Sequence, residues 1–494
     1  MTKLKKSRAL GSAAVLAGGS ASALLLALTA APGGASTVLT VDSLADGAAV
    51  AADCTTPVVD SCSLRDALSA AVSGDVITFK SGLTGTITLT EGFLTIEAAL
   101  TLTGAGSTSI TVDGNGSEHV FYVYSDVNGD VVMSGLTITG SEGGAAIYAQ
   151  NVGDFTLTDV NVTGNNGKYG GGLYINNIGA FNLTNSNVSN NTSDYAAGGV
   201  YIYQDTTSVT ITDTTIANNT TDGGGGGILS NHPGNLTIVG STFSGNHAAG
   251  MGGALYLGTD DQVITISDST FNGNTSTDEG GALDFDGVAQ VVTINNTTIS
   301  GNSSDAVGGG IWKDEGGSLT INQSTIVENT ATDGAGIFVT DGVPVSIVLS
   351  GSIVSNNSLT LEPLSLPSAV KGADISIDWE GGDVLSFDHS LVGLVNDAAE
   401  SHITDLGGNI RSSTPGLSPL ADNGGRTKTM ALLATSAAVN AGPSPVATFV
   451  GNQFDQRGTG YARVVGTRAD IGAFEIQPPP APPAPEPVTP KFTG

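Results

Sequence analysis

Residues 264–285 read ITISDSTFNGNTSTDEGGALDF, and closely similar stretches lie before and after them in the chain. Residues 236–257 read LTIVGSTFSGNHAAGMGGALYL, and residues 292–313 read VTINNTTISGNSSDAVGGGIWK. Successive stretches therefore begin 28 residues apart (264 − 236 and 292 − 264). Repetition at a fixed period of this length is typical of solenoid proteins, in which each repeat stacks on its neighbours.

One asparagine recurs in every repeat. In the aligned repeats it falls at Asn165, Asn190, Asn218, Asn246, Asn274, Asn302, Asn329 and Asn356. A buried column of asparagines can hydrogen-bond amide to amide from one coil to the next. We therefore predict an internal asparagine ladder along the solenoid.

Each repeat also contains short segments in which apolar and polar residues alternate, separated by turn residues. Leu236 to Ile238, the segment around Phe243 and the residues after Gly252-Gly253 are examples. Alternation at period 2 predicts β-strands, and glycine pairs permit tight corners. We predict an all-β, right-handed parallel β-helix of about 28 residues and three short strands per coil, capped at both ends.

Two other repeat architectures fit less well. Leucine-rich repeats need a segment compatible with a helix or 3₁₀ turn in each unit, which these coils lack. The calcium-binding nonapeptide roll has a shorter period and an Asp at a fixed step, and neither feature is present here.

The composition is strongly acidic, with 46 Asp and Glu against 16 Lys and Arg and a formal net charge of −30. Such a charge repels nucleic acid and anionic lipid, so we expect neither as a partner. It also disfavours bare acidic glycans, although calcium could bridge them to the protein. No cofactor and no metal site is predicted beyond weak surface calcium binding.

The N-terminus has the pattern of an export signal. Lys3 to Arg8 precede an apolar run from Ala13 to Ala31, and small residues allow cleavage after Ala35. The alternative is a membrane anchor, but Gly18, Gly19 and Ser20 interrupt the run. We predict a signal peptide over residues 1–35 and a secreted or cell-surface protein, with no transmembrane segment in the mature chain.

The remaining chain divides by pattern. Cys54 and Cys62 are the two cysteines, and in an exported chain they predict a disulfide that staples a small N-terminal cap over residues 36–80. Residues 81–372 are assigned to the β-helix and residues 373–476 to C-terminal coils and a cap. Residues 477–494 form a Pro-rich tail that we expect to be disordered. We expect a monomer.

Several motifs carry a resemblance to known exported proteins. Segments such as Gly252-Gly253-Ala254-Leu255 and Phe271-Asn-Gly-Asn274 resemble the polymorphic outer membrane protein repeats, over roughly residues 137–356. Cys62-Ser-Leu-Arg-Asp-Ala67 is similar to the CSLREA segment of exported bacterial β-helices, with Asp in place of Glu. The resemblance implies an exported, envelope-associated protein and implies no particular reaction.

A second terminal motif resembles the choice-of-anchor Q region. It begins at Pro419 with PLADNGGRTKT and continues through residues 438–442, 455–458 and 469–475. Residues 439–442 read Val-Asn-Ala-Gly where that family usually has Ile-Asp-Ala-Gly. This region lies just before varied C-terminal anchoring signals in that family.

A pectin-lyase-like fold is shared by polysaccharide lyases, glycoside hydrolases and adhesins, so the fold does not decide the function. Polygalacturonase-like enzymes carry Gly-His-Gly and Arg-Ile-Lys, and the chain contains neither. A lyase of this kind needs an arginine or lysine as its base. Between residues 137 and 356 the sequence contains two such residues, Lys168 and Lys313.

One column of residues could nevertheless bind a ligand. In each coil, the residue that follows the apolar residue after the glycine pair should point outward, because strand side chains alternate. That column reads Tyr148, Tyr174, Tyr201, Leu229, Tyr256, Asp284, Trp312 and Phe338. Two positions further on, on the same face, lie Asn176, Tyr203, Asn231, Asp286 and Asp314. Aromatic rings beside carboxylates and amides suit sugar rings and their hydroxyls.

Three interpretations of this stripe stay open. The leading one is a non-enzymatic surface or adhesive protein that binds an extracellular or cell-wall polysaccharide, or a host or neighbour surface, through Tyr174, Tyr201, Tyr203, Tyr256, Trp312 and Phe338. The alternative is a polysaccharide-degrading hydrolase or lyase, with Asp284, Asp286 and Asp314 as the candidate catalytic acids. The third is a stabilising aromatic ladder without a ligand.

Overall fold

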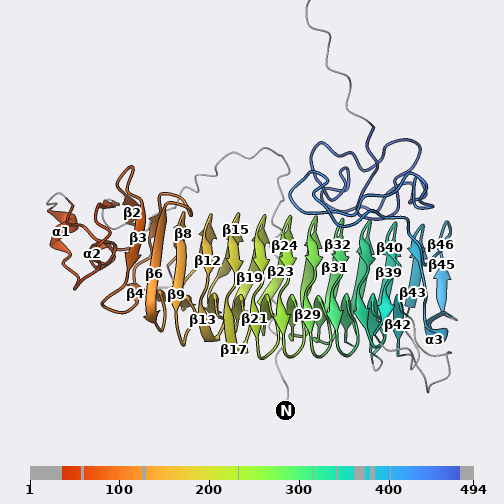
Figure 1. Ribbon diagram of the computed structural model, residues 1–494, viewed down its shortest axis with the longest axis horizontal. Coiled ribbons are helices and arrows are strands. Elements are labelled where there is room, and N and C mark those ends of the chain that lie inside the picture. Colours follow the sequence, from red (N-terminus) through yellow and green to blue (C-terminus); the bar gives the residue numbers. More distant parts are fainter. Residues whose placement is uncertain are drawn as a thin grey trace, which may run out of the picture. The chain divides into compact units, whose positions relative to one another are not determined.

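The repeats fold into a parallel β-solenoid in the computed structural model, which confirms the predicted all-β class. The structure describes residues 36–478 apart from 57–59, 125–128, 232, 315, 341–342, 361–372, 379–383 and 401. The chain divides into two units, Met1–Ala35 and Ser36–Gly494. The predicted signal peptide and most of the Pro-rich tail lie outside the described residues. Figure 1 shows the strands of the larger unit stacked one coil on the next.

Strands of successive coils pair in register to form four parallel sheets. Sheet A contains β1 (Val38–Val41), β2 (Val76–Phe79), β5 (Thr101–Thr103), β8 (Val131–Ser134), β11 (Phe155–Thr158), β15 (Ala180–Thr184), β19 (Thr206–Thr212), β23 (Pro233–Val239), β27 (Val263–Ser267), β31 (Val291–Asn295), β35 (Ser318–Asn322), β39 (Ser346–Ser350), β43 (Val384–Asp388) and β45 (Ile403–Asp405). Sheet B contains β3 (Gly85–Thr88), β6 (Ile110–Ser117), β9 (Thr137–Ser141), β12 (Asn161–Thr163), β16 (Asn187–Ser189), β20 (Thr215–Ala217), β24 (Thr242–Ser244), β28 (Thr270–Asn272), β32 (Thr298–Ser300), β36 (Thr325–Val327), β40 (Ile353–Val354), β44 (Leu391–Val392) and β46 (Ile410–Arg411).

The other two sheets complete each coil. Sheet D contains β13 (Asn166–Tyr169), β17 (Thr192–Ala196), β21 (Thr220–Thr221), β25 (His247–Ala248), β29 (Thr275–Ser276), β33 (Ser303–Ser304), β37 (Thr330–Ala331) and β41 (Ser358–Leu359). Sheet C contains β4 (Leu94–Ile96), β7 (Phe121–Tyr124), β10 (Ile147–Gln150), β14 (Leu173–Asn176), β18 (Val200–Ile202), β22 (Ile228–Ser230), β26 (Leu255–Leu257), β30 (Leu283–Phe285), β34 (Ile311–Lys313), β38 (Ile337–Val339) and β42 (Ile375–Ile377). The prediction of three strands per coil is wrong for the central coils, because the short stretch after the ladder asparagine forms the strands of sheet D.

The core is a set of like-on-like ladders. Phe243 of β24 pairs with Phe271 of β28, and their rings stack with centroids 4.7 Å apart. Both side chains are fully buried, as are Leu283 and Phe285 of β30. Each such side chain contributes about 1.5–3 kcal/mol by leaving water, which is the main force that holds the coils together.

The asparagine ladder is confirmed, and its geometry satisfies every amide. Asn246 donates its side-chain amide to Oδ1 of Asn274 at 2.9 Å and to the carbonyl oxygen of Ile216 at 2.9 Å. Its backbone N–H also donates to Oδ1 of Asn274, at 3.1 Å. The same pattern runs through Asn165, Asn191, Asn219, Asn246, Asn274, Asn302, Asn329 and Asn357.

Three predicted ladder positions are wrong by one residue: Asn190, Asn218 and Asn356. Each has a positive φ, of 56°, 53° and 59° respectively, and precedes the true ladder residue. In a neighbouring coil Gly245, with φ 63°, takes that place. Asn tolerates the left-handed conformation better than most residues, so Asn-Asn and Gly-Asn are interchangeable at this turn.

The N-terminal end carries two short helices, α1 (Ala52–Thr55) and α2 (Leu64–Ala70). The predicted disulfide joins Cys54 to Cys62. Ser63 and Asp66 form a capping box that fixes the start of α2. Arg65 binds Asp46 at 2.7 Å and also donates to the carbonyl oxygens of Gly92 and Phe93, which ties the helices to the first coil.

The coils continue at the other end through β43 to β46, next to the one-turn helix α3 (Asp397–Glu400). Residues 373–476 were expected to form further coils and to close that end; the coils are present, but residues 413–476 fold back along the side of the solenoid (Figure 1). Thr298 donates to Gln456 at 2.6 Å, and Arg463 donates to Asn296 at 2.6 Å. The outward face of sheet B is apolar at this place, with Val327, Ile353 and Leu391 packing against Ile471 and its neighbours.

Candidate functional site

The predicted stripe is a true column on the outer face of sheet C. Strand register places Tyr122, Tyr148, Tyr174 and Tyr201 directly above one another. The column continues through Leu229, Tyr256, Asp284, Trp312 and Phe338, and it ends at Ser376. The sequence alignment of this column was therefore correct residue by residue.

Much of the column is covered, however. The exposed fraction is 6% for Tyr201, 8% for Trp312, 6% for Phe338 and 0% for Asp284. The expectation that these side chains lie open to solvent is wrong, because the turn before each strand of sheet C folds across them. A Cβ added to Gly280, for example, would lie 2.6 Å from Cβ of Asp284, so the turn needs glycine there.

The N-terminal half of the column is a stack of tyrosines. Tyr122 and Tyr148 are parallel at a centroid distance of 5.3 Å, and Tyr148 and Tyr174 stack at 4.7 Å. Rings that stack on one another cover each other's faces and turn their edges outward. This part of the column is therefore built first of all as a stabilising ladder.

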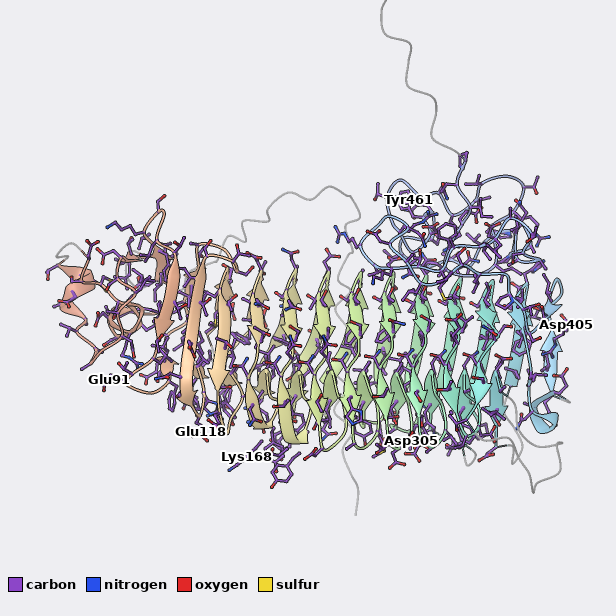
Figure 2. The ribbon with its side chains drawn as sticks, viewed as in Figure 1. Glu91, Glu118, Lys168, Asp305, Asp405 and Tyr461 are labelled. Carbon is purple, nitrogen blue, oxygen red and sulfur yellow. A yellow bond between two sulfur atoms is a disulfide. The ribbon has the colours of Figure 1, made fainter. Side chains whose placement is uncertain are left out.

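An exposed group of tyrosines lies against this ladder. Tyr169, Tyr195 and Tyr203 have 49%, 59% and 36% of their surface exposed, and we refer to them as the tyrosine patch. Tyr169 stacks on Tyr195 at 5.3 Å. Sequence reasoning identified Tyr203 but missed Tyr169 and Tyr195, because they lie in the strands of sheet D that it took for a turn. Lys168, beside Tyr169, projects from the lower edge of the solenoid in Figure 2.

The patch is held in place by the buried tyrosines. Tyr203 contacts Tyr174 and Tyr201, at centroid distances of 6.1 and 5.6 Å, and Tyr169 contacts Tyr201 at 6.0 Å. Burial raises the pKa of Tyr174 and Tyr201 above the value of about 10 for an ordinary tyrosine, so their hydroxyls stay protonated even at alkaline pH.

In the C-terminal half of the column, Asp284 lies near two acids outside it, Asp286 and Glu279. Tyr256 donates to Asp286 at 2.6 Å, and burial raises the pKa of Asp286. Neither carboxyl oxygen of Asp284 has a hydrogen-bond partner among the described residues. Burial, followed by the nearby carboxylates of Asp286 and Glu279, raises the pKa of Asp284 well above its usual range.

The remaining candidate acid and base are engaged elsewhere. Asp314 accepts a hydrogen bond from Thr340 at 2.9 Å. Lys313 points inward and is fully buried, and its ammonium donates to the carbonyl oxygens of Gly287 and Asp314 at 3.3 and 2.9 Å. Lys313 is thus unable to serve as a lyase base at the surface.

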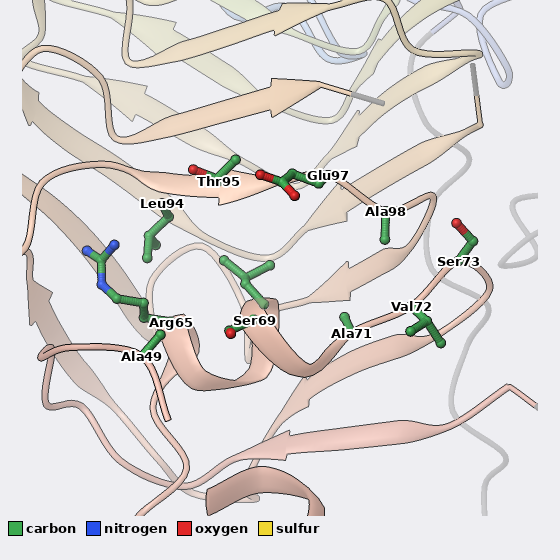
Figure 3. A pocket seen from close by; sticks show the side chains of 11 residues that line it. Ala49, Arg65, Ser69, Ala71, Val72, Ser73, Leu94, Thr95, Glu97 and Ala98 are labelled. Carbon is green, nitrogen blue, oxygen red and sulfur yellow. The ribbon is translucent and has the colours of Figure 1, made fainter. Parts of the chain in front are cut away.

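Other parts of the described chain offer little chemistry. A cavity of about 620 Å³ lies between α2 and β4, lined by Arg65, Leu68, Leu94 and Glu97 among others (Figure 3). Its arginine is already bound to Asp46. No three Asp, Glu, His or Cys side chains in the described ranges are placed to hold one metal ion. None of the described helices has the length and apolar character needed to cross a membrane.

Comparison with known proteins agrees with the fold. The model of the "Right handed beta helix region" matches residues 98–262, and that of the "Chlamydia polymorphic membrane protein repeat" matches residues 268–285. None of the curated proteins matches the chain significantly. Among solved structures, the crystal structure of pectate lyase Pel9A is 16% identical and has a TM-score of 0.43, covering 90% of this chain and 97% of its own.

Proposed function

We propose that this chain is a non-enzymatic surface protein that binds neutral glycans through the tyrosine patch. The observation that carries the proposal is the exposure of Tyr169, Tyr195 and Tyr203, whose rings pack against the half-buried Tyr174 or the buried Tyr201 or stack on one another. Aromatic rings that are already held in place lose little entropy when a sugar stacks on them.

Polar groups beside the patch suit the hydroxyls of a sugar. Asn231 donates weakly to the hydroxyl of Tyr201 at 3.5 Å. Amides and phenol hydroxyls can both donate and accept, which is what recognition of a neutral sugar requires. The formal charge of −30 favours neutral glycans over acidic ones.

The expected location follows from the sequence and one comparison. The basic and apolar start of the chain predicts export, and the CSLREA-like and choice-of-anchor Q-like segments suggest an envelope protein. The matched polymorphic membrane protein repeat supports a cell-surface site. A protein at that site would meet extracellular or cell-wall polysaccharides, or a host or neighbouring cell.

Binding is favoured over hydrolysis by the placement of the candidate acids. A hydrolase needs two carboxyls that reach the scissile bond. Asp284 has no exposed surface, and Asp286 is bonded to Tyr256. Trp312 and Phe338, which we assigned to ligand binding, are also covered and support stability rather than contact with a glycan.

One experiment separates the two functions. The chain from Ser36 is incubated with a panel of neutral and acidic polysaccharides, with and without calcium, and both retention and new chain ends are measured. Retention of a neutral glycan without new ends supports the proposal. New ends that disappear in Asp286→Asn would replace it with a glycan-degrading enzyme.

A further inference from the structure

Asp284 occupies a place that neighbouring coils fill with apolar or aromatic side chains. Tyr256 lies in the coil before it and Trp312 in the coil after it, and Leu229 takes the same position one coil further back. The carboxyl is completely buried, and both of its oxygens lack a hydrogen-bond partner in the described part of the chain. An ionised carboxylate in such a place is strongly unfavourable unless a charge or donor compensates it.

The charged groups around Asp284 make ionisation still less favourable. Its own coil contributes Asp278, Glu279 and Asp286, and the coil after it contributes Asp314. The coil before it presents the hydroxyl of Tyr256, which donates to Asp286.

Among the described residues, Lys313 is a cation on the strand that pairs with the strand of Asp284. Lys313 directs its ammonium to the carbonyl oxygens of Gly287 and Asp314. Glu315, which follows Asp314 in the sequence, lies outside the described residues. The surroundings of Asp284 are therefore dominated by negative charge.

We infer that Asp284 is a proton-binding site that holds this part of the column closed in its neutral form. When the proton leaves, the charge must reach water, and the turn that contains Gly280 is the cover that separates it from solvent. That turn lies against Cβ of Asp284, so it has to move for the carboxylate to become hydrated. Trp312 pairs directly with Asp284 in the strand register, so its indole lies beside the carboxyl whose hydration changes. This inference concerns pH and does not depend on glycan binding.

Trp312 provides a direct reporter. The chain has two tryptophans, Trp312 and Trp379, so Trp379→Phe leaves Trp312 as the sole fluorescent indole. In that background we expect a red shift of the emission as pH rises from 4 to 9. Its midpoint should lie well above the value of about 3.9 for an ordinary Asp, because burial and the nearby carboxylates disfavour the charged form.

Variants of Asp284 and Asp286 test the assignment. Asp284→Asn and Asp284→Leu, the second copying Leu229, should abolish the transition, with far-UV circular dichroism as the check of folding. Asp286→Asn should keep the transition and lower its midpoint, because it removes a like charge. A wild-type emission that does not change with pH, or the same transition in a folded Asp284→Asn protein, would overturn the inference.

A parallel pH titration, once with calcium and once with a chelator, tests whether the site binds a proton or a divalent cation. A midpoint that is the same in both solutions supports the proton as the species bound. A midpoint that falls by more than one unit with calcium would mean that the carboxylates hold a divalent cation, which would overturn the assignment.

Discussion

Asn357 donates both its backbone N–H and its side-chain amide to the same oxygen of Asp374, at 2.9 and 2.8 Å. Each asparagine before it makes this pair of bonds to the next asparagine, so Asp374 is the acceptor that ends the ladder. Its second carboxyl oxygen accepts the backbone N–H of Leu394 at 2.7 Å. A carboxylate suits the end of the ladder because it accepts several hydrogen bonds and has no N–H group of its own that would need an acceptor.

Replacing Asp374 by Asn should therefore destabilise the protein. An Asn side chain has one oxygen and one NH₂ group, so only one of the two acceptor positions of Asp374 would be kept. Either the amide groups of Asn357 or the backbone N–H of Leu394 would then face the NH₂ group and lose their acceptor. We expect the free energy of unfolding to fall by about 1–3 kcal/mol, measured by urea unfolding. Asp305→Asn, at an exposed acid on the lower edge in Figure 2, is the matched control and should change stability by less than about 0.5 kcal/mol. An equal effect of the two changes would refute the role given to Asp374.

The Asn190-Asn191 pair allows a test between adjacent residues. Asn191→Ala removes the acceptor of the backbone N–H of Asn165 and of one of its two side-chain N–H bonds, the other going to Ile138. Each buried N–H that loses its acceptor should lower the free energy of unfolding by about 1–3 kcal/mol. Asn190→Gly should be neutral or slightly stabilising, because glycine holds that turn in other coils. Thermal melts of the two variants decide the point, and a larger loss at Asn190 would contradict the assigned ladder.

The sequence predicted the parts of the fold that repeat. Period, strand alternation and the column on sheet C could be read because every coil supplies another copy of the same pattern. The choice between Asn190 and Asn191 could not be made, since both residues are asparagine and only the φ angle distinguishes them.

The parts that the sequence did not predict depend on how turns and distant segments pack. The burial of Asp284 depends on the turn at Gly280, which lies in its own repeat but has no periodic signal of its own. The position of Tyr195 in the patch depends on a short strand that resembles a turn. The docking of residues 413–476 depends on contacts between residues more than 100 positions apart, such as Thr298 with Gln456.

The docked C-terminal segment should contribute strongly to stability. Ile471 is fully buried against sheet B, and Ile471→Ala should lower the free energy of unfolding by about 2–5 kcal/mol through the cavity that it leaves. Val450→Ala in the same segment is the control, because Val450 is 94% exposed. Calorimetry on both variants is the measurement. Equal melting temperatures would show that the segment is not held by this apolar contact.

The same interface should make stability depend on pH. Burial raises the pKa of Asp268 to about 6, whereas an Asp in an unfolded chain has a pKa of about 3.9. Between these values the folded state binds more protons, so the free energy of unfolding falls as pH rises from about 4 to about 6. Glu475, whose pKa burial raises to about 7, acts in the same direction.

Asp268→Asn isolates this contribution. Urea unfolding at pH 4 and pH 7 measures how far the free energy of unfolding falls between these values. This fall should be smaller in the variant than in the wild type by about 1–2 kcal/mol. Asn296, which donates to Asp268 at 3.1 Å, keeps an acceptor in the variant. An unchanged pH dependence would contradict the proton uptake assigned to Asp268.

The central claim is that the tyrosine patch binds a neutral glycan, and the dissociation constant for a retained glycan tests it most directly. Calorimetric titration should compare the wild type with Tyr195→Ala/Tyr203→Ala and with the control Val263→Ala/Val291→Ala, which trims exposed valines of sheet A. For the tyrosine variant we predict binding at least tenfold weaker in a protein that remains folded, and for the control we predict wild-type binding. Equal binding by the tyrosine variant, or no binding of any neutral glycan by the wild type, would contradict the claim.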